Sequence, residues 1–138
     1  MPAGQDAASR RDVEMLFDEL PEPIDLEIDT ATETSYWTDR GEFPRGNTLN
    51  KADVSGVFKA EDQREYTILG RHLHEAIGLK IDGRNQQIYV TDLGGTVYRY
   101  ERDGTGVEKL FDGQGEYTGI ALAHLDAARV REMYGITI

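Results

Sequence analysis

Apolar and polar residues alternate along two separate stretches of the chain. In the first stretch Ile24, Leu26 and Ile28 share one face, and the residues between them are acidic. A period of two is the spacing of a β-strand with one buried face. Clusters of turn-forming residues, such as DTATE, DGRNQ and RDGTG, separate the runs. The pattern therefore predicts several short antiparallel strands joined by tight turns.

The two stretches are copies of one another. Residues 24–41 align with residues 77–94 without a gap, and residues 47–56 align with 95–104 once EFPRG is treated as an insertion. The positions with identical residues near the middle of the repeat are Tyr36, Thr38, Asp39 and Gly41 in the first copy and Tyr89, Thr91, Asp92 and Gly94 in the second. Such a match indicates a duplication, and a repeat is the first feature to establish because it decides the architecture.

The alternation within each copy predicts three strands. A fourth strand is predicted at residues 64–73 after the first copy and at residues 106–112 after the second. Four short antiparallel strands repeated about every 40–50 residues are typical of a β-propeller blade. We therefore expect an all-β fold built from propeller blades, with residues 12–125 forming half of a propeller. Residues 1–11 are expected to be flexible.

The two ends of the chain continue the repeat as fragments. Residues 12–24 resemble residues 106–120 and are interpreted as the last strand of a preceding blade; residues 119–125 resemble a first strand. With these ends the chain holds about three blade-equivalents. A helix is the alternative for the N-terminal fragment, because its apolar residues also fit a helical period; they are Val13, Leu16, Phe17 and Leu20.

A short helix and tail are predicted for residues 126–138. Asp126 is a suitable N-cap, and Gly135 is a suitable stop, because glycine accepts the left-handed conformation that ends many helices.

The motifs YWTDRG and GLKID…IYVTDLGGTVYRY resemble the YWTD repeat (low-density lipoprotein receptor class B type) of β-propeller proteins. The segments LPEPIDLEID, YWTDRG…GNTLN and HEAIG are similar to those of stand-alone intracellular propellers. Several such propellers belong to natural-product pathways and include hetero-Diels–Alderase-like cyclases. The resemblance covers roughly residues 12–125. It implies a propeller, and it implies a cyclase only at the level of the family, because no individual catalytic residue is matched.

Composition narrows the range of functions. The chain has 138 residues, no cysteine and a formal net charge of −11. Nucleic acids and anionic membranes attract basic proteins, so neither is an expected partner. Without cysteine there is no disulfide, thiolate metal site or thiol nucleophile, and with no apolar leader we expect a cytoplasmic location. No cofactor is expected.

A propeller ring contains about 4–8 blades, which is more than this chain supplies. A single copy leaves sheet edges uncovered, which is an aggregation hazard. We therefore expect a homodimer in which two half-rings complete one six-bladed ring about a two-fold axis. In that arrangement the terminal fragments of the two copies share a composite blade.

The expected site lies at the mouth of the channel, on the loops that enter the first strand and join the second strand to the third. His72 and His74 would share one face of an extended strand beside Glu75, and His124 could approach them. These three residues, His72, His74 and Glu75, are the catalytic candidates. A divalent metal site is the alternative for two histidines and a carboxylate. The other alternative is that these histidines have no catalytic role and are rim or strand residues whose side chains bind the backbone.

The inserted loop EFPRG adds charged residues to the same rim. Arginine binds carboxylates and polarised carbonyls, so this loop could hold a substrate. The candidate binding residues are Arg40, Glu42, Arg45 and Tyr117. A solvated loop of mutually compensating charges is the alternative, and it would contribute little energy.

The YWTD residues themselves are expected to be structural. Tyr36 and Thr38 share one face of a strand and Trp37 lies on the other, so both faces can pack against neighbouring blades. Asp39 and Asp92, each before a turn, are expected to bind the local backbone. Tyr98 and Tyr100 share a face and are expected to pack.

The chain contains no P-loop, nucleophile elbow or cysteine nucleophile. The sequence predicts a small-molecule-binding propeller whose chemistry, if any, is a cyclisation that depends on orientation and hydrogen bonding. The alternatives are a non-catalytic protein-interaction propeller and a metal-dependent, lactonase-like hydrolase.

Overall fold

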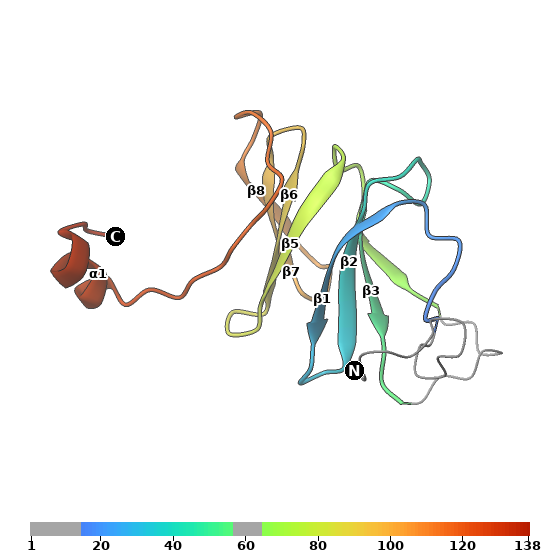
Figure 1. Ribbon diagram of the computed structural model, residues 1–138, viewed down its shortest axis with the longest axis horizontal. Coiled ribbons are helices and arrows are strands. Elements are labelled where there is room, and N and C mark those ends of the chain that lie inside the picture. The colour runs from blue at the N-terminus through green and yellow to red at the C-terminus, as the bar shows by residue number, and fades with distance from the viewer. Residues whose placement is uncertain (1–14, 57–64) are drawn as a thin grey trace, which may run out of the picture.

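Two four-stranded antiparallel sheets make up the body of the molecule (Figure 1). The computed structural model describes residues 15–56 and 65–138. The first sheet, blade 1, contains β1 (Pro23–Asp29), β2 (Thr34–Asp39), β3 (Thr48–Asp53) and β4 (Thr67–Gly70), in that order. The second sheet, blade 2, contains β5 (Ala76–Asp82), β6 (Gln87–Asp92), β7 (Val97–Glu101) and β8 (Val107–Phe111). The all-β class and the blade topology are therefore confirmed.

The duplication is visible in the strand register. Leu26 pairs with Trp37 in blade 1, and the equivalent Leu79 pairs with Val90 in blade 2. Both first strands have an irregularity two to three residues earlier, at the same place in the repeat. The loops repeat as well: the N–H of Arg40 donates to the carbonyl of Glu22, as the N–H of the equivalent Leu93 donates to that of Glu75.

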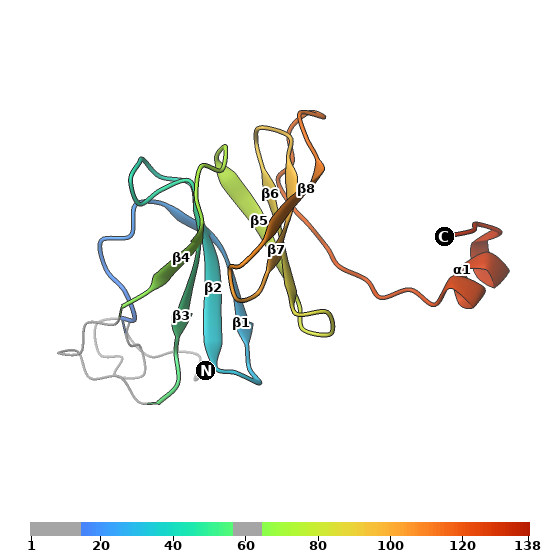
Figure 2. The same ribbon diagram turned by 180° about the vertical axis from the view of Figure 1, so that it is seen from behind.

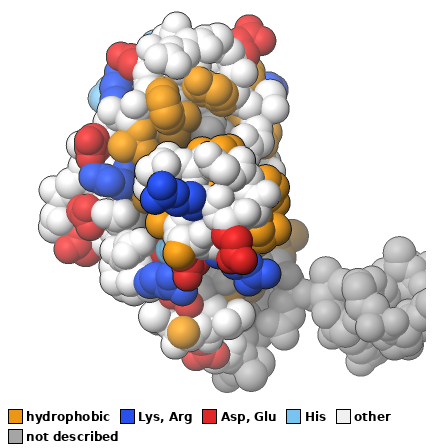
Figure 3. Space-filling model, turned by 90° about the vertical axis from the view of Figure 1, so that its left-hand side faces the viewer, with side chains coloured by type: hydrophobic (Ala, Val, Ile, Leu, Met, Phe, Trp, Pro, Cys, Tyr) orange, Lys and Arg blue, Asp and Glu red, His pale blue; other side chains and the backbone are white. Residues whose placement is uncertain are grey.

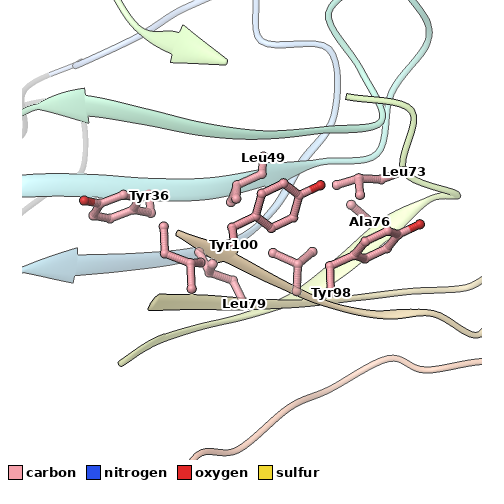
Figure 4. Packing of buried hydrophobic residues seen from close by; sticks show 9 residues of the cluster. Tyr36, Leu49, Leu73, Ala76, Leu79, Tyr98 and Tyr100 are labelled. Atoms are coloured by element: carbon pink, nitrogen blue, oxygen red, sulfur yellow. The ribbon is translucent and has the colours of Figure 1, made fainter. Parts of the chain in front are cut away.

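The core lies between the two blades. Tyr36 and Leu49 of blade 1 pack against a larger apolar set of blade 2, and the labelled side chains of Figure 4 point toward one another across this seam. The members from blade 2 and the loop before it are Leu73, Ala76, Leu79, Ile88, Val90, Tyr98 and Tyr100. The expected packing role of Tyr36, Tyr98 and Tyr100 is confirmed, since each is at most 5% exposed.

Polar contacts fix the first strands of the two blades against each other. Oδ2 of Asp25 accepts the N–H of Leu79 at 2.9 Å, and Oε2 of Glu27 accepts the N–H of Ile81 at 2.6 Å. The side chains of β1 thus bind backbone groups on the free edge of β5, which would otherwise be left without partners. The blades are held at their inner strands as well as through the apolar core.

The N-terminal fragment is not a strand. Residues 15–22 have no strand or helix, so both interpretations fail for the described part of that fragment; residues 1–14, including the expected flexible terminus, lie outside the described residues. Neither of the two sheets in the described residues includes residues 15–22. The ring of Phe17 instead packs on Trp37, with centroids 5.2 Å apart, and Tyr66 contacts the same indole at 5.2 Å.

The C-terminal fragment also lacks a strand, because residues 112–126 form no ladder. Its first part still lies against β5 of blade 2. This proximity is shown at Gly78 on β5, where an added Cβ would lie 3.2 Å from the side chain of Ile120. The chain then leaves the body as an extended arm that ends in α1 (Ala127–Tyr134), seen from both sides in Figures 1 and 2. The predicted helix is confirmed, with Asp126 accepting two backbone N–H groups as N-cap and Gly135 in the left-handed conformation.

The described residues therefore form the two whole blades that the sequence predicts, while the leading and trailing strands of a third blade-equivalent are not formed among them. Within each blade the first and fourth strands lie at opposite edges of the sheet. The N-terminal fragment, predicted as a fourth strand, therefore cannot pair directly with a C-terminal fragment predicted as a first strand. A composite blade made from the two terminal fragments would need two further strands between them. The homodimer itself stays a prediction.

The outer face of blade 1 is exposed along β1, although Phe17 and Tyr66 cover Trp37 on β2 of the same face. Leu26 is 57% exposed, whereas its repeat equivalent Leu79 is fully buried against blade 1. Ile24 and Ile28, on the same strand as Leu26, are also exposed. At the other end, Figure 3 shows hydrophobic side chains among charged ones on the side that carries the C-terminal arm. The β1 end of the two-blade unit thus presents apolar surface of the kind that the repeat buries internally at Leu79.

Candidate functional site

The predicted site residues lie on loops at one end of both sheets, which we call the rim. These loops are residues 40–47, between β2 and β3; residues 71–75, between β4 and β5; and residues 112–119, after β8. The alternation of strand directions brings these loops to the same end. Topology therefore places the candidate residues on one rim, as the sequence predicts, while their functional roles stay predictions.

Arg40 is held between two carboxylates. Its Nη2 lies 2.5 Å from Oε1 of Glu22, and its Nη1 lies 3.8 Å from Oε2 of Glu75. The hydrogen bond and charge of Glu22, with the charge of Glu75, raise the pKa of Arg40 above its ordinary value. Arg40 thus joins the β2–β3 loop to the entrances of both first strands. A guanidinium with two acidic neighbours is a weaker anion clamp than an unpaired one.

Asn47 connects the inserted loop to the loop that carries the histidines. Its carbonyl accepts the N–H of Leu73 at 3.1 Å, and its Oδ1 accepts the N–H of Glu75 at 2.8 Å. Asn47 has a positive φ of 55°, a conformation that asparagine tolerates better than most residues. These bonds make the two loops one rigid unit.

Two further contacts join the same loops. Nη1 of Arg71 donates to the carbonyl of Pro44 at 3.0 Å, and the ring of Phe43 stacks on His72 with centroids 5.7 Å apart. Phe43 is 68% exposed, so the stacked pair stands at the surface of the rim. The peptide bond between Phe43 and Pro44 is cis.

The histidines are not arranged as an extended strand. His72 has a positive φ of 62°, and Glu75 one of 57°, so the segment is a loop rather than the start of β5. The N–H of His74 donates to Oδ2 of Asp92 at 3.0 Å, which fixes its backbone and leaves the side chain exposed. The prediction that His72 and His74 share one face of a strand is therefore wrong at the level of the backbone.

His124 does not approach the other histidines. Its Nε2 lies 3.1 Å from Oδ1 of Asp82, the last residue of β5, at the opposite end of the sheet from the rim. Burial favours the protonated form of Asp82, but hydrogen bonds from Asn85 and the charge of His124 outweigh it and lower the pKa of that carboxyl. Within residues 15–56 and 65–138, no group of three His, Cys, Asp or Glu side chains is placed to hold a metal.

The remaining candidates stand at the surface of the rim. The backbone carbonyls of Glu42 and Arg45 accept hydrogen bonds inside the loop, from the N–H of Gly46 and the hydroxyl of Thr48, while both side chains are exposed. Tyr117 is half-buried, and its N–H donates to the carbonyl of Asp92 at 3.2 Å. Glu42, Arg45, His72 and His74 thus have side chains that are open to a ligand, whereas the exposed Glu75 is paired with Arg40.

The two repeat aspartates bind the local backbone, as predicted. Oδ1 of Asp39 accepts the N–H of Glu22 at 3.1 Å and that of Gly41 at 2.9 Å. Burial raises the pKa of Asp39, and these two hydrogen bonds partly oppose the shift. Asp92 accepts the N–H of Thr96 in the same way. Thr38 also contributes to structure, because its hydroxyl donates to the carbonyl of Ile77 in blade 2 at 2.8 Å.

The residues that shape the rim from within were not predicted from the sequence; they are Glu22, Phe43 and Asn47. A signal for Asn47 was present, because the repeat aligns it with Gly95. Both have a positive φ, and the carbonyl of Gly95 accepts the N–H of Gln114 as that of Asn47 accepts the N–H of Leu73. A pair of Asn and Gly at one repeat position is a cue for a left-handed backbone.

The repeated four-stranded units define the class of protein: the chain is built from blades of the β-propeller type. No protein-family model matches the chain. It is 47% identical over 124 residues to a protein named low-density lipoprotein receptor-related protein 1 from Pyricularia oryzae. It is 46% identical over 129 residues to a protein named 3-hydroxyacyl-CoA dehydrogenase-like protein LAM1 from Cochliobolus heterostrophus.

These matches cover 88% and 89% of this chain but only 40% and 27% of the two relatives. One region is thus shared at similar identity by proteins that carry different names. The receptor-related name agrees with the propeller architecture, and homology therefore supports a propeller in general terms. None of the described helices is long and apolar enough to cross a membrane.

Proposed function

We propose that this chain is part of a β-propeller that binds a small organic molecule at its rim. The observation that carries the proposal is the fusion of two loops, residues 40–47 and 71–75, into one unit. Asn47, the stack of Phe43 on His72 and the bond from Arg71 hold them together. Binding residues concentrate on loops that a rigid scaffold supports. A fixed loop pair loses little conformational freedom when a ligand binds.

The exposed groups of the rim determine what it can bind. Arg45 offers a guanidinium for a carboxylate or carbonyl, and the rings of Phe43 and His72 offer an aromatic surface. Glu42 can accept a hydrogen bond from a ligand hydroxyl. Arg40 has its charge balanced by Glu22 and Glu75, so its role is to position the loops. The ligand that fits is an aromatic or unsaturated molecule with an acidic or carbonyl group.

A cyclisation at this rim is a proposal that builds on binding. Such a reaction needs a substrate held in a reactive conformation and a donor at the atom that gains partial charge. His72 and Arg45 are two exposed donors on the rim. The backbones of His74 and Glu75 are fixed, because the N–H of His74 donates to Asp92 on β6 and the N–H of Glu75 donates to Asn47.

The dehydrogenase-like name of one relative gives no support for redox chemistry here. Dinucleotide-binding enzymes place the cofactor on a parallel βαβ unit, whereas every strand pair in the described part of this chain is antiparallel. The match covers 27% of that relative, so its named activity can belong to another region.

A second candidate function, protein interaction, is favoured by the uncovered face of blade 1. Leu26 and its neighbours on β1 are exposed, and the buried indole N–H of Trp37 has no acceptor within the described residues. The interface inside the chain shows that another blade can cover such a face. We propose that a second copy of this chain completes the ring, giving at least four whole blades, which is within the range of known propellers.

Ligand screening by thermal shift on the full chain tests the binding proposal, with aromatic carboxylates and carbonyl compounds as the library. Compounds that raise the melting temperature should lose their effect in Arg45→Ala and His72→Ala. The matched control is Arg84→Ala, in the β5–β6 turn at the opposite end of the sheet. Equal stabilisation of all three variants, or no stabilising compound at all, would contradict a rim site.

A further inference from the structure

A groove of about 360 Å³ lies between the blades at the end opposite the rim. This volume is within the range of small-molecule sites. The residues that line it come from the β1–β2, β5–β6 and β7–β8 turns and the adjoining strands; they are Thr32, Thr34, Tyr36, Lys51, Gln86, Glu101, Arg102 and Asp103. None of these residues belongs to the rim, so the groove is a separate feature.

Tyr36 and Lys51 present two open donors to this groove. They are direct register partners on β2 and β3, so their side chains leave the same face side by side. The hydroxyl oxygen of Tyr36 accepts Nε of Arg102 at 2.9 Å, and its hydrogen has no acceptor in residues 15–56 and 65–138. Burial raises the pKa of Tyr36, so the hydroxyl stays protonated at neutral pH. Lys51 makes no hydrogen bond or ion pair with a described residue, although its charge acts on the carboxylate of Asp103 and helps to lower the pKa of that group.

Blade 2 supplies an internal comparison. The repeat equivalents of Tyr36 and Lys51 are Tyr89 and Arg99, which are also direct register partners. There both groups are satisfied: the hydroxyl of Tyr89 donates to Oε1 of Gln87 at 3.2 Å, and Arg99 forms an ion pair with Glu108. The same pair of residue types is therefore closed in blade 2 and open in blade 1. The open pair is the one that lies in the groove.

The other charged groups limit the ligand. Arg102 is neutralised by an ion pair with Asp29, in which both side chains are largely buried. Glu101 and Asp103 add two carboxylates to the walls. Hydrogen bonds from Thr105 lower the pKa of Asp103, which is therefore ionised at neutral pH. Because the walls hold two carboxylates and one further ammonium, a bound anion can carry only a single negative charge and must lie at Lys51, away from the two carboxylates.

We propose that this groove binds a small organic monocarboxylate that also carries a hydroxyl group. The carboxylate accepts hydrogen bonds from Lys51 and Tyr36, and the hydroxyl donates to Glu101 or Asp103 on the opposite wall. Charge-assisted hydrogen bonds are stronger than neutral ones, so the carboxylate supplies most of the affinity. This site does not depend on the rim or on its proposed function.

Chemical-shift mapping with the ¹⁵N-labelled full chain tests this site, with 4-hydroxybenzoate as the probe and 4-hydroxybenzamide as its uncharged isostere. Hydroxybenzoate should shift the amides of residues 32–36, 51 and 101–103 in a saturable way. The benzamide should bind about tenfold more weakly, because it lacks the charge that Lys51 recognises. Shifts confined to the rim would refute the site.

Variants at repeat-equivalent positions provide matched controls. Lys51→Met should weaken hydroxybenzoate binding by about tenfold, while Arg99→Met in blade 2 should leave it unchanged. Tyr36→Phe and Tyr89→Phe form a second pair with the same expectation. The amide dispersion of each variant shows whether it is folded. No saturable shift below about 10 mM ligand, equal binding of the benzamide, or unchanged binding by Lys51→Met would overturn the proposal.

Discussion

Leu26 and Leu79 occupy the same position in the two repeats, but truncating each to alanine should change the free energy of unfolding by very different amounts. Leu79 is fully buried in the core between the blades, whereas Leu26 is 57% exposed. Removing a buried leucine side chain typically costs about 2–5 kcal/mol, which is a large part of the about 5–15 kcal/mol that stabilises a domain. A substitution at an exposed position usually changes stability by less than about 0.5 kcal/mol.

Urea denaturation, followed by circular dichroism over a series of protein concentrations, measures both effects. Leu79→Ala should lower the free energy of unfolding by the same amount at every concentration. Leu26→Ala should cost almost nothing in dilute solution, and its cost should grow with concentration as a second copy covers β1. The reasoning is refuted if Leu79→Ala costs less than about 1 kcal/mol, or if Leu26→Ala costs as much as Leu79→Ala in the dilute limit.

Three other predictions concern the seam between the blades. Arg102→Ala should cost about 3–5 kcal/mol in urea denaturation, because it leaves a buried carboxylate on blade 1 without its partner. Burial raises the pKa values of Tyr98 and Tyr100 to about 12. The contribution of the two neutral tyrosines to the free energy of unfolding should therefore be fully present below pH 10 and be lost as the pH rises toward 12. Thermal melts across this pH range measure the loss. Gly70→Ala should cost about 1–3 kcal/mol, because its Cβ would lie 2.6 Å from the hydroxyl of Tyr100, whereas Gly83→Ala meets nothing within 4 Å and should be close to neutral.

Each of these predictions has a clear contrary result. A near-neutral Arg102→Ala would mean that the ion pair does not join the blades. Melting temperatures that stay constant from pH 9.5 to 12 would show that the tyrosines ionise equally in the folded and unfolded states. Equal effects of the two glycine substitutions would place Gly70 outside the seam.

The repeat made most of the fold predictable from the sequence. Alternation and turns placed the strands of both blades, because each strand buries one face and each turn is local. The match between residues 24–41 and 77–94 predicted equivalent strands, and the structure gives them the same register. Local chemistry was enough for α1 as well, since Asp126 and Gly135 cap it as expected.

The terminal fragments could not be predicted in the same way. A strand needs a neighbouring strand to satisfy its backbone groups, and in the described part of the chain neither residues 15–22 nor residues 119–125 pair with one. Phe17 illustrates the outcome, because its ring packs on Trp37 while its backbone forms no ladder.

The rim was predictable in position but not in geometry. The topology of a blade brings the loops to one end, yet the positive φ of His72 occurs in a loop whose Leu73 and Glu75 N–H groups donate to Asn47 of another loop. The pairing of Arg40 with Glu22 links residues 18 positions apart through tertiary structure. The groove at the other end had no sequence signal apart from the repeat alignment of Lys51 with Arg99.

The claim that blade 1 presents a face for another blade is tested most directly by the mass of the chain in solution. Light scattering on a size-exclusion column should give a mass near twice 15.5 kDa for the wild-type chain, and 15.5 kDa for Leu26→Asp, which places a charge on the uncovered face. A wild-type chain that stays at 15.5 kDa at every concentration would contradict completion of the ring by a second copy.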